Sequence, residues 1–374
     1  MIRSLHVLPA LEEGGVERTV VQEALLEQSL GILPLVVSSG GSMAGELLAA
    51  GIEHLTLPMA SKNPLTIVLN AQRLATLIRQ RQIEIVHAHS RAPAWSAYLA
   101  CQATKAIFVT TFHGIYSGQN FIKRWYNGVM VRGAAVIAAS TQVREHLIAA
   151  YGVSLDKVRV IPLWSSPPLP LDAGEMDDFR RQYGLPEEGR VIAMVGRLTR
   201  LKGHEVLIRA FALLRDKTSR LLVVGHPKRP GYGDELRALC RALGIADRVV
   251  FAGGGTTTAQ LAYESADVVV SASLQPESFG LTMLEAACRG IPVVATAHGG
   301  ALDLVIPGET GFLSPVGDPA ALAAGIERVL DLTPGEYRRM GEQARQHGVR
   351  FDRKNSGSRL AALYEELLTP TRRQ

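Results

Sequence analysis

Short apolar runs alternate with helical patterns along the first half of the chain. The run at residues 4–9 is followed by a glycine turn and by a pattern of period 3.6 over residues 16–31, which ends on a glycine. Further apolar runs, with helical stretches between them, lie at residues 33–39, 83–90, 106–114 and 134–140. Strands that alternate with helices form parallel sheets covered on both faces, so this half predicts a Rossmann-like α/β domain.

The same pattern restarts after a proline-rich stretch at residues 158–175. Its prolines exclude a continuous helix or a central strand and predict a linker; they are Pro162, Pro167, Pro168 and Pro170. Beyond it we expect strands at 190–198, 220–225, 248–253, 267–273 and 291–297, with helices at 204–216, 235–244 and 281–290. The pattern therefore predicts two domains, residues 1–165 and 166–374, and a last helix at about 353–370 that packs on the first domain.

Length and composition agree with two domains. The chain has 374 residues, of which 47% are hydrophobic, enough for two cores of about 150–200 residues each. Glu12 and Glu13 interrupt the first apolar stretch, and no run reaches the roughly 20 apolar residues of a membrane span, so we expect no signal peptide and a cytoplasmic location. Cys101, Cys240 and Cys288 are widely spaced in apolar surroundings and are expected to be reduced core residues.

Positive charge is concentrated in the first half. The net charge is only +5, but residues 73–159 hold eleven Lys or Arg against three Asp or Glu. This excess favours an anionic partner, such as a phosphate group, an acidic glycan or a lipid surface. A solvated face is the alternative.

Two loops that follow strands carry the residue types of a phosphate site. Gly14 and Gly15 form a turn between the first strand and the first helix, where backbone can approach a phosphate, although a glycine pair alone is more typical of a simple turn. In the second half, Gly196 and Arg197 end a strand, and Lys202 precedes a helix. Cations at this edge of a parallel sheet converge where ligands usually bind, unless they are ordinary surface charges.

Two acids flank a further helix start in the second half. Glu277 and Glu285 surround a segment whose N–H groups can form an anion-binding wall, at Phe279, Gly280 and Leu281. Glu277, just outside the wall, can accept hydrogen bonds from sugar hydroxyls. Glu285, within the helix, can hold the two hydroxyls of a ribose, because a carboxylate only accepts. A helix cap is the simpler alternative for Glu277.

Five motifs in this order resemble one family. They lie at residues 12–18, 111–114, 196–203, 277–285 and 299–313. The chain resembles the retaining family 4 glycosyltransferases of the GT-B architecture, in which two Rossmann-like domains face each other across a cleft. Segments 60–66, 89–100 and 224–239 look most like bacterial transferases that build lipopolysaccharide.

The resemblance implies a role for each matched residue on the donor side. It implies a UDP- or GDP-linked sugar as donor, no metal ion and no nucleic acid. Arg197 and Lys202 would neutralise the leaving diphosphate beside Gly196. Glu277 would contact the donor sugar and Glu285 the ribose, and Gly255 would lie against the nucleobase.

On the acceptor side, the resemblance assigns the first domain to a glycan or glycolipid. Gly14 and Gly15 would close on the diphosphate, and His113 would lie near the acceptor hydroxyl. His87 and His89 could suggest a metal, but their alternation on a strand and the absence of nearby acids favour structure or acceptor contact. Residues 121–133 combine cations with aromatic rings and are expected either to dock on the inner face of the cytoplasmic membrane or to pack into the domain.

One departure from the family keeps other functions open. After residues 160–162 relatives carry an Asn/Arg-Gly-Ile/Val-Asp turn, whereas this chain continues Leu-Trp-Ser-Ser-Pro-Pro. A degenerate nucleotide-sugar-binding subunit is therefore the alternative to a transferase. A sugar-nucleotide epimerase of the same architecture is disfavoured, because the spacing of the two glutamates follows the transferase pattern.

Overall fold

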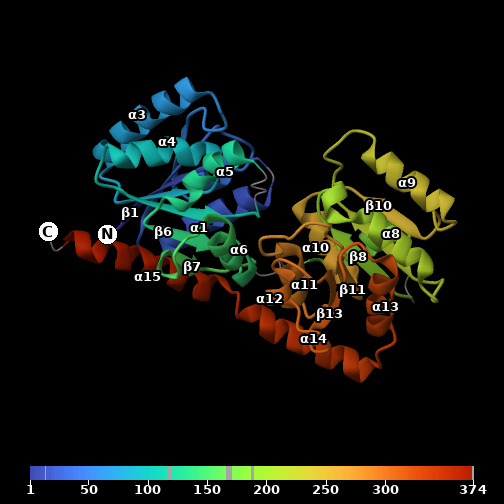
Figure 1. Ribbon diagram of the computed structural model, residues 1–374. Helices are drawn as coiled ribbons and strands as arrows, with labels where there is room; N and C mark the ends of the chain where they lie inside the picture. The colour runs from blue at the N-terminus through green and yellow to red at the C-terminus, as the bar shows by residue number, and fades with distance from the viewer. Residues whose placement is uncertain (13, 116–119, 166–170, 187–188, 373–374) are drawn as a thin grey trace. The chain divides into compact units, whose positions relative to one another are not determined.

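The computed structural model describes residues 1–12, 14–115, 120–165, 171–186 and 189–372 (Figure 1). The chain divides into two compact units. The first comprises residues 1–163 together with 353–374, and the second comprises residues 164–352. Of the expected linker, residues 166–170, with Pro167, Pro168 and Pro170, lie outside the described residues, as does Glu13 of the first motif.

The first unit is a seven-stranded parallel sheet with helices against it. The strand order is β3-β2-β1-β4-β5-β6-β7. The strands are β1 (Arg3–Val7), β2 (Leu33–Ser38), β3 (Glu53–Thr56), β4 (Ile85–Ala88), β5 (Ile107–Phe112), β6 (Ala135–Ala138) and β7 (Val158–Val160). The helices are α1 (Gly15–Ser29), α2 (Ala44–Ala49), α3 (Pro64–Arg81), α4 (Arg91–Gln102), α5 (Phe121–Asn127), α6 (Thr141–Tyr151) and α15 (Arg353–Arg372), with short 3₁₀ turns at Gly128–Val131 and Leu155–Lys157.

The second unit is a six-stranded parallel sheet. The order is β10-β9-β8-β11-β12-β13. The strands are β8 (Val191–Val195), β9 (Arg220–Val224), β10 (Val249–Ala252), β11 (Val268–Ser271), β12 (Val293–Thr296) and β13 (Gly311–Ser314). The helices are α7 (Ala173–Gln182), α8 (His204–Leu213), α9 (Tyr232–Ala242), α10 (Thr256–Ser265), α11 (Leu281–Cys288), α12 (Ala301–Leu304), α13 (Pro319–Leu330) and α14 (Pro334–Val349), and a 3₁₀ turn covers Arg200–Lys202. The predicted fold class, two Rossmann-like domains, is confirmed.

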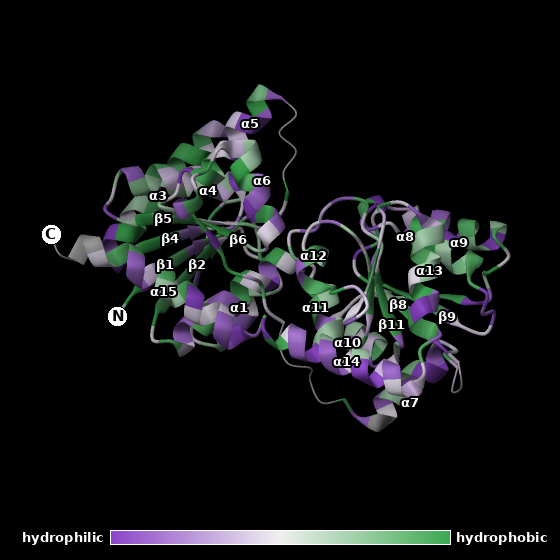
Figure 2. Cartoon of the chain, turned by 60° about the horizontal axis from the view of Figure 1, so that its bottom comes forward, coloured by the Kyte–Doolittle hydropathy of each residue, from purple (hydrophilic) through white to green (hydrophobic). Residues whose placement is uncertain are grey.

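Each sheet is the centre of its own core. Most strands are rich in apolar residues because helices cover both faces, and the central strands are coloured largely hydrophobic in Figure 2. The last helix, α15, belongs to the first unit: Leu360, Leu363 and Tyr364 are buried in a cluster with Ile2 and Ile85. None of the described helices has both the length and the apolar character that crossing a membrane requires.

Candidate functional site

The second unit places its motifs on two adjacent strands where the strand order reverses. β8 and β11 pair side by side, while β9 continues the sheet beyond β8 and β12 beyond β11. Loops that follow such a pair diverge and leave a crevice at the carboxyl ends of the strands, the usual ligand site of an open α/β sheet. Residues 196–203 follow β8 and residues 272–280 follow β11.

An ion pair joins these two loops. Lys202 Nζ donates to Glu277 Oε1 over 2.8 Å, and both side chains are largely shielded, with 29% and 19% of their surface exposed. Ser273 Oγ also donates to Glu277 Oε1. Burial opposes ionisation of Glu277, yet the Lys202 charge and these hydrogen bonds outweigh it and hold the pKa of Glu277 below its ordinary value. The acid is therefore ionised and fixed at neutral pH.

Glycine at position 203 allows the loop to carry Lys202 so close to β11. Gly203 has φ +74°, and a Cβ there would lie 1.8 Å from the carbonyl oxygen of Ala272. Only a residue without a side chain fits this contact and this backbone conformation. Arg197 lies on the same loop and is exposed. The two predicted cations thus share one loop, with Lys202 oriented by Glu277 and Arg197 directed to solvent.

The start of α11 is anchored by the glycines of the 299–313 motif. The N–H of Gly300 donates to the carbonyl oxygen of Glu277 over 2.9 Å, and a Cβ on Gly300 would lie 1.9 Å from that of Phe279. Phe279 itself is buried, and Gly280 caps the helix with φ +104°. The predicted wall of Phe279, Gly280 and Leu281 therefore lies at a helix start whose backbone is fixed by close packing.

Glu285 lies about one turn into α11 and has a partner that the sequence did not reveal. Tyr263 Oη, from α10, donates to Glu285 Oε2 over 2.7 Å. Burial and the Glu285 charge raise the pKa of Tyr263 well above its usual value, so the phenol stays a donor. One carboxylate oxygen of Glu285 is thereby oriented.

Gly255, the position predicted to lie against a nucleobase, caps α10 with φ +129°. The preceding loop is held to the loop after β9, because the N–H of Gly254 donates to His226 Nε2 over 3.0 Å. His226 is exposed. It was not among the predicted residues.

The order of the strands in the first unit reverses between β1 and β4, and the predicted residues lie after β1, at this reversal, and after β5, the strand next to β4. Gly14 and Gly15 begin α1 after β1, and His113 follows β5. Gly14 has an extended backbone, and a Cβ on Gly15 would meet nothing within 4 Å. Packing against the described residues of the first unit therefore does not require glycine at position 15. Burial lowers the pKa of His113 to about 4, so its ring is neutral at neutral pH.

A chain of hydrogen bonds leads from His113 into the first unit. His113 Nε2 lies 3.0 Å from His89 Nδ1, and His89 Nε2 lies 2.9 Å from His6 Nδ1 on β1. The expectation that no acid lies near the strand histidines is wrong. Glu23 and Glu27 of α1 face them: His89 Nε2 lies 3.7 Å from Glu23 Oε2, and His6 Nε2 lies 3.0 Å from Glu27 Oε1. These acids follow the first strand by about 20 residues, and only packing of α1 on the sheet brings them close.

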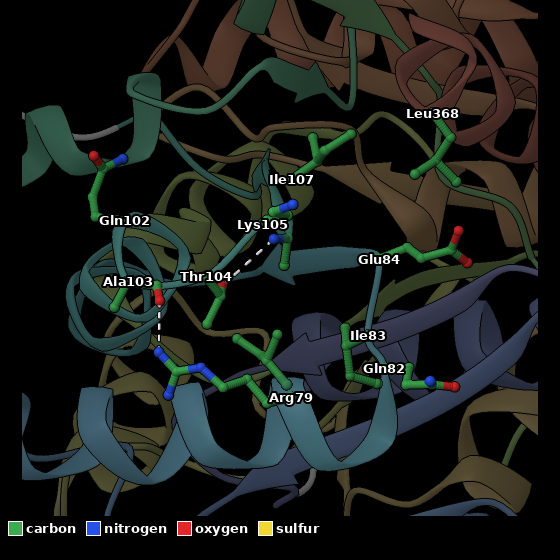
Figure 3. Close-up of a pocket in the computed structure, with 12 residues that line it drawn as sticks. Arg79, Gln82, Ile83, Glu84, Gln102, Ala103, Thr104, Lys105, Ile107 and Leu368 are labelled. Atoms are coloured by element: carbon green, nitrogen blue, oxygen red, sulfur yellow. Dashed lines mark hydrogen bonds between the residues drawn. The ribbon is translucent and has the colours of Figure 1, made fainter. Parts of the chain in front are cut away.

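A pocket of about 620 Å³ lies elsewhere in the first unit, at the amino ends of β4 and β5. Figure 3 shows its lining, where Arg79 donates to the carbonyl oxygen of Ala103 over 2.7 Å, with Glu84, Lys105 and Leu368 around it. Parallel α/β sheets bind ligands at the opposite edge. None of the predicted site residues lines this pocket.

Comparison with solved structures defines the architecture of the chain. The structure matches a glycosyltransferase from Rickettsia africae with a TM-score of 0.90 and 33% identity over 98% of both chains. It also shares its fold with the Anabaena protein HepE, solved with UDP-glucose, at a TM-score of 0.85 and 22% identity over 98% of this chain and all of that one. The architecture is therefore GT-B.

The family follows from the sequence. Residues 13–164 match glycosyltransferase family 4, and residues 175–347 match the glycosyl transferases group 1. A D-inositol 3-phosphate glycosyltransferase of Corynebacterium efficiens is 32% identical over 77% of this chain and 67% of its own length. The one of Acidothermus cellulolyticus is 35% identical over 62% of this chain, which spans only 53% of that relative. The chain belongs to the family 4 glycosyltransferases.

Proposed function

We propose that the chain transfers a sugar from a nucleoside diphosphate donor to an acceptor hydroxyl, with retention at the anomeric carbon. The observation that carries this proposal is the Lys202–Glu277 pair at the strand reversal of the second unit, beside Arg197 and the start of α11. A cation held by a shielded acid, next to the N–H groups of a helix start, forms a preorganised site for a diphosphate.

Each residue of the second-unit site is proposed to bind a different part of the donor. Lys202 has three N–H donors and uses one on Glu277, so two remain for phosphate oxygens. Arg197 adds a forked contact, and Glu285, oriented by Tyr263, accepts from the ribose hydroxyls. As the bond from the anomeric carbon to the diphosphate oxygen breaks, the acceptor oxygen attacks from the same face. Its proton passes to the departing phosphate.

The first unit is proposed to serve the acceptor. No described residue of this unit comes close enough to a Cβ at position 15 to require glycine there, which supports a close approach of backbone to a ligand at the start of α1. The neutral ring of His113 can accept from or donate to a hydroxyl without bringing a charge into the site. It positions the acceptor, while the diphosphate takes the proton.

A thermal-shift screen with UDP, GDP and ADP, followed by turnover of the matching nucleotide sugars, tests the proposal. A nucleotide at 100 times its dissociation constant should stabilise the protein by about 2.7 kcal/mol. Binding without turnover on any donor and acceptor would identify a degenerate binding subunit instead. Absence of both would overturn the donor site.

We propose an anionic acceptor. The excess of cations at residues 73–159 supports this, and so do the relatives named D-inositol 3-phosphate glycosyltransferases. Phosphorylated polyols and phosphorylated lipid-linked glycans such as a lipopolysaccharide core share this chemistry. Assays with each, and with the dephosphorylated form of each, separate the two sources; equal rates on the dephosphorylated forms would contradict the proposal.

We further propose that α5 docks the first unit on an anionic membrane. Phe121, Ile122 and Trp125 are 83%, 75% and 54% exposed beside Lys123 and Arg124. The centre of the Trp125 ring lies 4.7 Å from that of the Trp95 ring, so Trp125 packs on Trp95 and is still accessible to solvent. Each cation near an anionic surface contributes about 1 kcal/mol.

Sedimentation with vesicles tests this docking. Anionic vesicles should bind the protein at low salt, and Lys123→Glu with Arg124→Glu should release it. Lys62→Glu with Arg73→Glu is the control, because it changes the net charge by the same amount at another place. Lys62 lies just before α3 and Arg73 lies within it, and both are exposed. Binding that is indifferent to lipid charge, salt and the first double substitution would contradict the proposal.

A further inference from the structure

The histidine cluster of the first unit has the composition of a metal site. Four buried residues, His6, Glu23, His87 and His89, offer ligand atoms that all lie within 4.8 Å of one another. In the part of the chain that the structure describes, no other group of three or more such residues occurs. Imidazole nitrogens with a carboxylate oxygen are typical ligands of Zn²⁺ and of related divalent ions.

One buried carboxylate oxygen in this cluster lacks a hydrogen-bond partner, which points to a ligand there. Among the described residues, Glu23 Oε2 is buried and makes no hydrogen bond, and His89 Nε2 lies 3.7 Å from it. His6 Nε2 and Glu27 Oε1 lie 3.0 Å apart and pair with each other. Buried polar atoms without partners are rare in folded proteins, and a bound ion is one established explanation. Glu23 is 5% exposed and Glu27 1%, so bulk water does not satisfy them.

We propose that His6, Glu23 and His89 bind one divalent transition-metal ion, with Zn²⁺ as its chemical type. Ligand atoms about 2.0–2.1 Å from a tetrahedral zinc lie roughly 3.3 Å apart. Here His6 Nδ1 and Glu23 Oε2 lie 2.9 and 3.7 Å from the same atom, His89 Nε2. The ligand atoms of the cluster all lie within 4.8 Å of one another, so adjustment of the side chains would bring these three around one ion.

The surroundings match what such an ion needs. With Nδ1 of His6 on the metal, its Nε2–H faces the Glu27 carboxylate, the partner that most often orients a metal-bound histidine. His89 turns its other nitrogen to His113. Two carboxylates, Glu23 and Glu27, balance the two charges of the ion, which a buried site requires. His87 already contacts Tyr364 and Thr111 with its two nitrogens and is not assigned as a ligand.

The site lies within the first unit, one hydrogen bond from His113, and its test does not depend on activity. The full chain, purified without added chelator, should contain about one zinc by elemental analysis. After dialysis against a chelator, Co²⁺ should bind with the visible spectrum of a tetrahedral complex and raise the melting temperature. Wild-type protein that holds no stoichiometric metal and takes up none would overturn the assignment. The cluster would then be a buried hydrogen-bond network of histidines and glutamates.

Variants locate the ion. Glu23→Gln and His89→Gln should lose Co²⁺ binding. Glu27→Gln should weaken it about 10- to 100-fold, because Glu27 orients the ligand His6 and does not itself bind the ion. His54→Gln is the matched control, since His54 lies in the same unit and contacts Ser38 instead of the cluster. Far-ultraviolet circular dichroism checks folding, and His6→Gln is the second ligand test if a variant unfolds. Equal binding by His54→Gln and Glu23→Gln would place the metal elsewhere and contradict the proposal.

Discussion

At the scale of single residues, the strongest expectation concerns the two cations of the loop after β8. Lys202→Ala and Arg197→Ala should each lower turnover about 10²–10³-fold, the usual cost of about 2.7–4 kcal/mol for losing one preorganised donor to a developing charge. Steady-state kinetics with the matching donor measures this. Arg209→Ala, an exposed cation on α8, is the control. Near-normal turnover of either variant would refute its phosphate role.

The two glutamates should separate into different kinetic effects. Glu285→Ala should mainly weaken binding of the nucleoside diphosphate, because it removes an acceptor of the ribose hydroxyls. Glu277→Ala should chiefly impair transfer, because Glu277 is assigned to the donor sugar, which free nucleotide lacks, so affinity for free nucleotide should be nearly kept. Calorimetry with the nucleoside diphosphate measures both. Equal losses of affinity would remove the distinction.

Glu277 should also give stability a dependence on pH. Its pKa is lowered in the folded chain, so its contribution is complete above its unfolded value of about 4.3 and is lost as the pH falls through the lower folded value. The difference in unfolding free energy between the wild type and Glu277→Gln should therefore shrink as the pH falls below about 4. Denaturant melts across this range measure it, and a difference that grows on acidification would contradict the ion pair.

At the scale of elements, the glycine before α8 is a structural requirement that can be isolated. Gly203→Ala combines the cost of a left-handed backbone with a collision against Ala272, whereas Gly231→Ala, at φ +79° before α9, has open space around it. The backbone term alone is roughly 1–2 kcal/mol. Gly203→Ala should be more destabilising than Gly231→Ala by about 1–3 kcal/mol in chemical denaturation. Equal losses would show that the close approach is absent.

The elements also show where the sequence was informative. Strands such as β8 and β11 could be predicted because they are almost wholly apolar, and Lys202 and Glu277 because they lie in the loops that follow such strands, where parallel sheets bind ligands. The short β3 was not predicted, because Glu53–Thr56 has a single apolar residue, Leu55, and is partly exposed at the sheet edge. Glu23 and Tyr263 escaped notice because a helical acid and a core tyrosine have no distinctive pattern until their helices pack.

At the scale of the whole molecule, α15 should contribute to the stability of the first unit. Leu363 is 3% exposed, so Leu363→Ala should cost about 2–5 kcal/mol of the unfolding free energy of that unit. Leu69→Ala is the control and should be nearly neutral, because Leu69 on α3 is 52% exposed. Hydrogen exchange shows which of the two units has lost stability, because its amides then exchange faster. Unchanged protection of β1 and β4 would show that α15 does not complete this core.

The return of α15 has a consequence during synthesis. Ile2 and Ile32 are among the earliest residues to leave the ribosome, yet Leu360 and Leu363, which cover them, are among the latest. At about 5–20 residues per second, the interval between them is tens of seconds. The second unit, whose residues 164–352 are contiguous, can complete its core within that interval. The half of the protein that is translated first is therefore the half that finishes folding last, with an open apolar face that a nascent-chain chaperone would recognise.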